Sequence, residues 1–431
     1  MIFLALIWIL FLWKTHKSVI HSQIPLEIND FPRGKKLPTN DSMSGCLLVM
    51  DDNARLVEWL AYHYFTAKLR YLIVAIDPRS TTSPQSILDR WTSHGFYYEI
   101  WQDEDYMGAR VLNKRQKLDE LGRQDLTTVH RVRQKAFYQF CLEHLEAQHR
   151  NTWTLLIDVD EYLVVNQEEM QNPVQHQEIM SSLGGVYQFV KEAAALATTR
   201  ADDKSKKSTY VQFASPCVTM PRLLFGTKQD TTEDADNIPS DVQLGNALDT
   251  MRWFYHANYS EFDRNGLGKT ILDLARIQIP KPHFPHPVNP HRPFQNICRD
   301  PKRIADLNQH AFLRVHHYLS TWETYSYRND SRRGGERSRE AWEYRAISDA
   351  GGKTRDAVPW LDGFVRRFGR PQATKVLKDA GLPDHYKHPP QVNDQWKFLF
   401  ADEFLDKRNK QSDSKFGQFL QNRTTNTKGR G

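Results

Sequence analysis

The sequence predicts an α/β fold, with a mostly parallel β-sheet covered by helices on both faces and preceded by an N-terminal membrane anchor. Three observations lead to this expectation. Apolar runs of strand length alternate with segments of helical spacing in the first part of the chain, which is typical of β-α-β units. Each of these runs ends in acidic residues. The chain begins with MIFLALIWILFLW, an apolar segment of membrane character.

Residues 1–19 are expected to be a signal anchor or a signal peptide. The apolar run is shorter than the ~20 residues with which a helix spans a bilayer. No small-x-small cleavage site follows it, which favours an uncleaved anchor. Lys14 and Lys17 on its far side argue against the usual orientation with the N-terminus in the cytosol. Burial of this segment in the core is the alternative.

Residues 20–44 are polar and rich in proline, which indicates a stem or linker. After it, four strands are expected at 46–50, 71–76, 95–101 and 154–157, separated by helices at 54–67, 86–93 and 131–149. Right-handed crossovers would make these strands parallel, with ligands at their carboxyl ends. The acids at those ends would then form one binding edge: Asp51, Asp52, Asp77, Asp103, Glu104, Asp105, Asp158, Asp160 and Glu161. Loop-starting aspartates and helix caps are an alternative that explains any one end by itself.

Beyond Asn166 the pattern is looser. A helix is expected at 186–197, and strands at 210–214, 269–274 and 311–318. Two short helices are expected at 360–368 and 371–380. The segments 200–208 and 227–250 are polar and indicate loops, and residues 411–431 resemble a disordered tail.

The remaining composition narrows the class of protein. The formal charge of +6 arises from 58 basic and 52 acidic residues without a pronounced basic block, so no nucleic-acid surface is expected. Four cysteines permit three complete pairings, and the sequence does not select one. They are too scattered for a zinc site. Sequons at Asn40, Asn258, Asn329 and Asn422 fit a lumenal location.

The segment LLIDVDEYLVV, residues 155–165, carries three carboxylates within an apolar run and has no basic residue among them. A buried unpaired carboxylate costs several kcal/mol, so such groups are paired or bind a cation. The simplest interpretation is that the strand ends here and opens into a polar site that contains a metal. Asp158 and Asp160 would point the same way because strand side chains alternate.

The order CLLVMDDN, EWLAYH and DVDEY resembles metal-dependent glycosyltransferases of the GT-A fold, a Rossmann-like architecture, and most closely glycosyltransferase family 92. The resemblance covers roughly residues 46–328. It implies a type II membrane protein of the Golgi or another secretory compartment, single-pass with a lumenal catalytic domain. That domain would span 45–328, with a nucleotide-binding half (45–166) and an acceptor half (167–328), followed by a helical extension (329–410). It also implies Mn²⁺, or Mg²⁺, and a nucleotide-sugar donor, with UDP expected because the family uses it.

The resemblance assigns roles to particular residues. Asp160 would bind the metal directly, and Asp158 would reach the ribose, or the metal through water. The family's His-Tyr pair corresponds to His317 and Tyr318, so His317 is the expected third ligand. His316 would face the opposite way on the same strand, and an ordinary core or loop histidine is the alternative for His317.

Nucleotide contacts are expected from the first two strand ends and from the long helix: Asp52, Asn53, Asp77, Arg133 and Gln134. The segment 266–287 lacks the spacing of a phosphate loop. It resembles the family's Gly-Lys strand leading to a His-x-Pro element, here His283 to Pro285, which would lie near the donor sugar or acceptor. A proline-rich turn explains that element equally well.

The resulting functional hypothesis is an inverting glycosyltransferase that moves a hexose to a glycan on a glycoprotein or polysaccharide. The base that activates the acceptor should be a carboxylate, with Glu323, Asp103, Glu104 and Asp105 as candidates and Glu323 placed in the catalytic set with Asp158 and Asp160. Two alternatives remain. One is a nucleotidyl- or phosphotransferase on the same fold, and the other is a non-catalytic, membrane-anchored glycan-binding protein.

Overall fold

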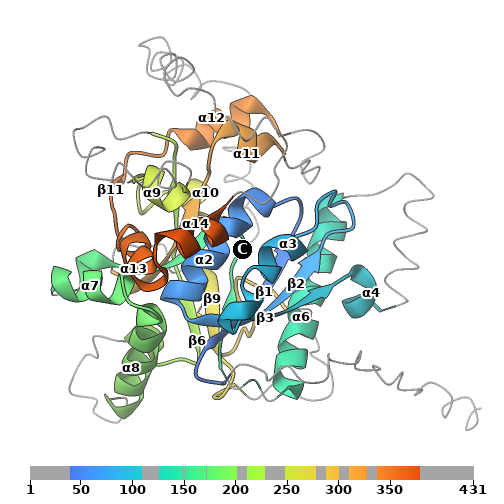
Figure 1. The fold of residues 1–431 in the computed structure, drawn as a ribbon, viewed down its shortest axis with the longest axis horizontal. Coiled ribbons are helices and arrows are strands. Elements are labelled where there is room, and N and C mark those ends of the chain that lie inside the picture. Colours follow the sequence, from blue (N-terminus) through green and yellow to red (C-terminus); the bar gives the residue numbers. More distant parts are fainter. Residues whose placement is uncertain are drawn as a thin grey trace, which may run out of the picture. The chain divides into compact units, whose positions relative to one another are not determined.

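Two β-sheets organise the chain (Figure 1). The computed structural model describes residues 39–108, 126–148, 150, 152–170, 172–200, 211–228, 248–277, 288–299, 310–327 and 337–378. These residues belong to a compact unit that begins at Thr39. The predicted anchor, most of the predicted stem, the element at His283 and the predicted tail lie outside the described residues.

The larger sheet has six strands in the order β3-β2-β1-β4-β9-β6. The pairs β2–β3, β1–β2 and β1–β4 are parallel, whereas β9 pairs antiparallel with both β4 and β6. The bounds are β1 (Met43–Val49), β2 (Leu69–Ile76), β3 (Tyr97–Trp101), β4 (Trp153–Leu156), β6 (Cys217–Met220) and β9 (Lys269–Asp273). All four strands expected in the first half are present, so the mixed α/β class is confirmed.

A second, five-stranded sheet, not expected from the sequence, has the order β11-β8-β7-β10-β5. Its strands are β5 (Glu161–Val165), β7 (Arg222–Phe225), β8 (Tyr255–His256), β10 (Leu313–Tyr318) and β11 (Gly352–Lys353). The chain leaves the first sheet at Leu156 and enters the second at Glu161. The residues between β4 and β5 therefore lie at the junction of the two sheets.

The prediction of a strand at 210–214 is wrong, because Val211–Phe213 forms a short 3₁₀ helix. The side chain of Gln212 accepts from the amide of Leu313 and donates to the carbonyl of Leu313, both at 3.1 Å. A side-chain amide thus makes the pair of hydrogen bonds that a neighbouring strand would make with its backbone.

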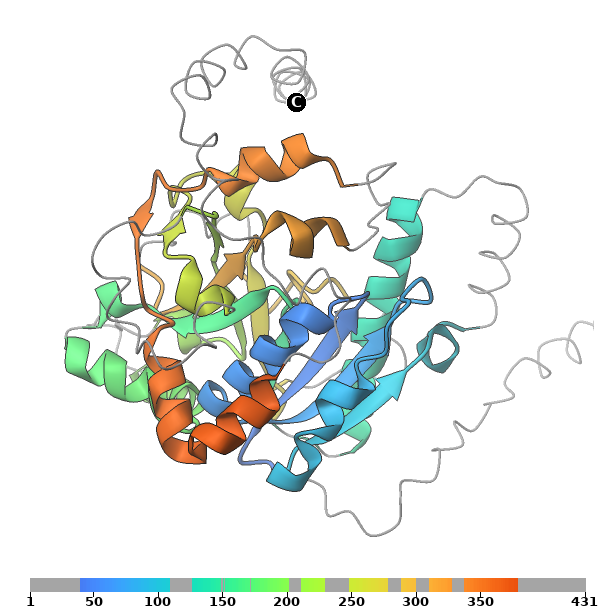
Figure 2. The same cartoon turned by 45° about the horizontal axis from the view of Figure 1, so that its top comes forward.

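Helices cover both faces of the parallel strands. In Figures 1 and 2, α2 (Asn53–Thr66) lies on one face and α6 (Leu126–Ala147) on the other. A disulfide joins Cys46 of β1 to Cys141 of α6. The other helices are α3 (Gln85–Asp89), α4 (Asp103–Tyr106), α7 (Pro173–Met180), α8 (Gly185–Arg200), α9 (Asp249–Arg252), α10 (Phe262–Asn265), α11 (Trp322–Tyr327), α12 (Arg339–Ala346), α13 (Pro359–Phe368) and α14 (Arg370–Leu377). No helix in the described ranges combines the length and apolar character needed to cross a membrane.

Helix α2 is buried along nearly its whole length and contacts β5 at the edge of the second sheet. The hydroxyl of Tyr62 donates to the carbonyl of Leu163 at 2.8 Å, and the amide of Leu163 donates to Nε2 of His63 at 3.2 Å. Burial lowers the pKa of His63 to about 3, so the neutral ring can accept this bond. Two α2 side chains thereby satisfy edge-strand groups that would otherwise lack a ladder partner.

The last described helices complete the same core. Helices α13 and α14 pack against α2, and the side chain of Trp360 is fully buried. Its ring lies 5.5 Å from that of Tyr62, and its Nε1 donates to Oγ1 of Thr250 at 2.9 Å. The region beyond residue 329 therefore contributes to the main core.

We expect Trp360→Ala to lower the free energy of unfolding by about 3–5 kcal/mol, because a large buried ring is replaced by a cavity. Urea unfolding measures this change. The control is Arg366→Ala in the same helix, where the arginine side chain is 64% exposed and its loss should cost less than about 0.5 kcal/mol. Equal effects of the two substitutions would contradict the assigned packing.

Candidate functional site at the junction of the two sheets

Three carboxylates meet between β4 and β5. Asp158, Asp160 and Glu161 each offer an oxygen within 4.8 Å of the others. The side chain of Asp158 is 39% exposed, that of Asp160 is 16% exposed, and that of Glu161 is fully buried. The strand ends in a carboxylate cluster as the sequence indicates, and the cluster opens to solvent on the side of Asp158.

Three cations from distant parts of the chain face these carboxylates. The ammonium of Lys269, the first residue of β9, lies 2.6 Å from Asp158 and 3.2 Å from Glu161. Arg222 Nη1 lies 3.2 Å from Glu161. No cation lies near the three carboxylates along the sequence, and the sequence does not predict that Lys269 or Arg222 pairs with them.

Arg55, on α2, completes this charge balance. Its Nη1 lies 2.9 Å from Oδ2 of Asp160, and its Nη2 donates to the carbonyl of Leu319 at 2.9 Å. The side chain is buried, so the ion pair is shielded from water and is stronger than a surface pair. Asp160 is therefore held by the helix that follows the first strand.

Burial and charge act in opposite directions on the acids. Burial raises the pKa of Glu161, and the ammonium of Lys269 only partly offsets this, so the pKa stays above its ordinary value. Burial would also raise the pKa of Asp158, but Lys269 outweighs it and the pKa lies below the usual range. Burial alone would lower the pKa of Lys269, but its two carboxylate partners raise it. Lys269 is therefore charged at neutral pH.

The glycines before Lys269 make room for this arrangement. Gly266 has a φ of +63°, and a Cβ there would overlap the guanidinium of Arg222. A Cβ on Gly268 would overlap the backbone oxygen of Met220 on β6. The Gly-Lys segment is thus shaped by close packing, in agreement with its lack of phosphate-loop spacing.

His317 lies beside Asp160, with its Nε2 3.4 Å from Oδ2 of that carboxylate. Burial lowers the pKa of His317 to about 4 despite the nearby carboxylate, so the ring is neutral at pH 7. Its Nδ1 has no hydrogen-bond partner among the described residues. His316 points away, with its ring 4.4 Å from that of Phe225. Of the three expected metal ligands, Asp158 and Asp160 thus lie within 4.8 Å of each other, and His317 is beside Asp160 but outside that group.

The expected nucleotide contacts at the second strand end bind one another. Arg133 donates to both carboxylate oxygens of Asp103, at 2.8 and 2.9 Å, and to Asp77 at 3.0 Å. Arg79 also pairs with Asp77, at 2.9 Å. Burial would raise the pKa of Asp77, but Arg79 and Arg133 bring it below its ordinary value. This buried group of charges fastens α4 and α6 to the end of β2.

The first strand end forms a tightly bonded turn. Asp52 accepts from the amide of Met50 at 2.9 Å, and Asn53 donates to the carbonyl of Ser83 at 3.0 Å. Asp51 accepts from the backbone amides of residues 81 and 82. Gln134 is partly exposed on α6, next to Arg133. Loop and helix contacts thus account for most of the acids at the first three strand ends.

The candidate bases are spread over two elements. Asp105 accepts from the amide of Gln102 at 2.6 Å and caps α4, Glu104 is exposed, and Asp103 is bound by Arg133. Glu323 lies in the first turn of α11, partly exposed. Helix α11 follows β10, the strand that carries His317, so Glu323 is the candidate connected most directly to the junction.

Glu58, the acidic residue of the EWLAYH motif, has a structural role. Its carboxylate accepts from the amides of Asp249 and Thr250, at 2.7 and 3.0 Å, and so caps the first turn of α9. Burial, with Asp249 nearby, raises the pKa of Glu58 to about 7.

Comparison of the chain with protein-family models, curated proteins and solved structures finds no match.

We expect Lys269→Met to lower the free energy of unfolding by about 3–5 kcal/mol, because it leaves Glu161 buried without its ammonium partner. Adding Glu161→Gln should restore a large part of this loss, since the amide carries no charge. Urea unfolding midpoints measure both.

The control is Lys228→Met, which removes a partly exposed ion pair with Asp349 and should cost about 1 kcal/mol or less. A double variant that is no more stable than Lys269→Met would show that Lys269 acts through packing and not as a counter-ion.

Proposed function

We propose that this chain is an inverting, metal-dependent glycosyltransferase of the secretory pathway. It would transfer a hexose from a nucleotide-sugar, most simply a UDP-sugar, to a glycan acceptor on a glycoprotein or polysaccharide. The observation that carries the proposal is the pair Asp158 and Asp160 after the carboxyl end of β4, with Asp158 partly open to solvent and His317 beside Asp160. The motifs CLLVMDDN, EWLAYH and DVDEY, which resemble glycosyltransferase family 92 and the GT-A fold, support it.

The strand order supports a nucleotide site at the same place. From β1 the chain first builds outward through β2 and β3, and then returns to the other side of β1 with β4. In open α/β sheets, ligands bind outside the carboxyl ends of the strands at the point where the order reverses. That point lies between β1 and β4, so Asp52 and Asn53 flank it on one side and Asp158 on the other.

Two of the three carboxylates suit a hard divalent cation. Asp158 is partly open to solvent, whereas Asp160 is only 16% exposed. Both supply the oxygen ligands that Mn²⁺ and Mg²⁺ prefer, and the neutral ring of His317 offers nitrogen. Glu161 does not suit this role, because it is fully buried between Lys269 and Arg222. A bound cation would stabilise the charge that develops on a departing diphosphate.

The chain's own groups would prepare that chemistry. Lys269 holds the carboxylate of Asp158 in place, and Arg55 holds that of Asp160. Ligand binding therefore does not have to immobilise either carboxylate. Glu323 is the proposed base, a carboxylate that would accept the proton of the acceptor hydroxyl. If the product instead carries a phosphate, the phosphotransferase alternative holds.

A lumenal location is supported by the cysteines and sequons. All four cysteines are paired, Cys46 with Cys141 and Cys217 with Cys298, and disulfides persist mainly in oxidising compartments. Asn40 and Asn258, in the two described sequons, are exposed. We propose a Golgi or other secretory membrane, with the N-terminal segment as the anchor.

We expect UDP to bind the purified chain in the presence of Mn²⁺ and to bind at least about tenfold more weakly after EDTA is added, because the diphosphate loses its counter-charge. Isothermal titration calorimetry measures this. Asp160→Asn should abolish the Mn²⁺-dependent part and all transfer. The control is Asp362→Asn, a 69% exposed carboxylate on α13, which should behave as wild type.

Metal-independent binding of UDP would remove the metal from the proposal. Absence of UDP binding by folded protein, together with retained glycan binding, would favour the non-catalytic alternative.

We expect the chain produced in a eukaryotic secretory host to carry an N-glycan at Asn258, because the asparagine is exposed in a turn and its sequon is complete. Digestion with an N-glycosidase should increase its mobility on a gel, and Asn258→Gln should remove that part of the shift. Asn172→Gln, at an exposed asparagine outside any sequon, is the control for the substitution. An unshifted wild-type band would argue against lumenal exposure of this unit.

A further inference from the structure

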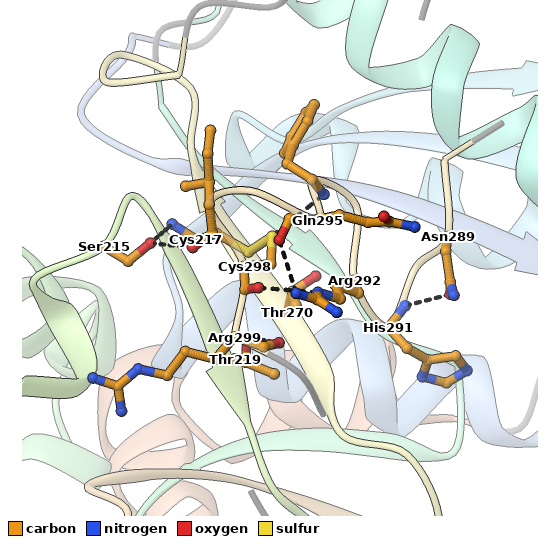
Figure 3. Close-up of a disulfide and its surroundings, with 12 residues drawn as sticks. Ser215, Cys217, Thr219, Thr270, Asn289, His291, Arg292, Gln295, Cys298 and Arg299 are labelled. Atoms are coloured by element: carbon orange, nitrogen blue, oxygen red, sulfur yellow. Dashed lines mark hydrogen bonds between the residues drawn. A yellow bond between two sulfur atoms is a disulfide. The ribbon is translucent and has the colours of Figure 1, made fainter. Parts of the chain in front are cut away.

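The segment 288–299 is attached to the edge of the six-stranded sheet near the carboxylate junction. Cys298 forms a disulfide with Cys217 of β6, and Oγ1 of Thr270 on β9 donates to the carbonyl of Pro290 at 3.1 Å. The hydroxyl of Ser215 donates to the carbonyl of residue 297 at 2.9 Å. Figure 3 shows the disulfide with Ser215, Thr270 and His291 around it. The segment is thus fixed to β9 near its start and to β6 near its end.

This segment presents His291 with a defined tautomer. Nδ1 of His291 lies 2.8 Å from the carbonyl oxygen of Gly268. A carbonyl can only accept, so Nδ1 carries the hydrogen and Nε2 keeps its lone pair. Burial, together with the ammonium of Lys269, lowers the pKa of His291 to about 4, so the ring is neutral at pH 7. The ring remains partly exposed.

His291 lies close enough to Asp158 and Lys269 for both charges to affect its ring. Gly268 immediately precedes Lys269, whose ammonium lies 2.6 Å from Asp158, and the charges of Asp158 and Lys269 both act on the imidazole. A lone pair on a neutral ring repels an anion such as phosphate or carboxylate but accepts a hydrogen bond from a hydroxyl group. The ring therefore matches a neutral hydrogen-bond donor, and the hydroxyl groups of a sugar are donors of this kind.

We infer that the disulfide-anchored segment 288–299 is a wall of the Asp158 site, and that Nε2 of His291 accepts a hydrogen bond from a hydroxyl group of the donor sugar. This inference rests on the proposed function and deepens it, because it names a residue that selects the sugar separately from the nucleotide. The disulfide between Cys217 and Cys298 acts as a positioning element, since it holds the segment against β6.

Calorimetry on the oxidised full chain with Mn²⁺ tests the inference. The probes are UDP, UDP-glucose, UDP-galactose and UDP-N-acetylglucosamine. Wild-type protein should bind one UDP-sugar more tightly than UDP. His291→Ala should reduce that preference by about 3–10-fold, as expected for one hydrogen bond, and leave the affinity for UDP unchanged. The control is His310→Ala, which removes a 66% exposed imidazole and should change neither affinity.

The disulfide is tested by the pair Cys217→Ser and Cys298→Ser. This double variant should lose the same preference and keep UDP binding, and adding His291→Ala should cause no further loss. The matched control, Cys46→Ser with Cys141→Ser, should keep the preference when UDP binding shows that it is folded. A loss in the first pair that His291→Ala deepens further would overturn the positioning role.

Two results would overturn the assignment of His291 itself. One is an unchanged preference in His291→Ala, and the other is a wild-type protein that binds none of the three UDP-sugars more tightly than UDP. Both leave the nucleotide site intact. Absence of UDP binding by wild-type protein would instead overturn the proposed function, and the inference with it.

Discussion

The ion pairs around Glu161 are the constraint on which the junction of the two sheets depends. Glu161 is fully buried, as is Lys269, and neither could be tolerated there as an isolated charge. Their pairing fixes the first residue of β5 relative to the first residue of β9, and these strands belong to different sheets. One ion pair therefore sets how the chain passes from one sheet to the other, and so where Asp158 and Asp160 lie.

The same arrangement separates structural charges from available ones. Asp77, Asp103 and Arg133 satisfy one another in a buried group, and Glu58 is used by the backbone of α9. Asp158, although paired with Lys269, keeps much of its surface in contact with solvent. Its exposure distinguishes Asp158 from the buried carboxylates that stabilise the fold.

The parallel strands and their helices could be predicted from sequence because each depends on local periodicity. The second sheet could not, since β8 and β11 have two residues each and their pairing depends on long-range contacts. At the site, the D-x-D spacing identifies the strand end and the His-Tyr pair suggests His317. The partners Arg55, Arg222 and Lys269 carry no local signal, because an ion pair between distant elements depends only on the folded geometry. His291 carries no local signal either, because its position depends on a hydrogen bond to Gly268 and on the disulfide between Cys217 and Cys298.

The packing of α13 and α14 on α2 has a consequence for the order of events during synthesis. Helix α2 is made near the beginning of the chain, and the face on which α13 and α14 pack is covered by residues that leave the ribosome roughly three hundred residues later. Until then, the nascent chain exposes the surface that Trp360 will bury. Completion of this core must follow translation of most of the chain, and the growing polypeptide presents a natural binding surface for chaperones in the meantime.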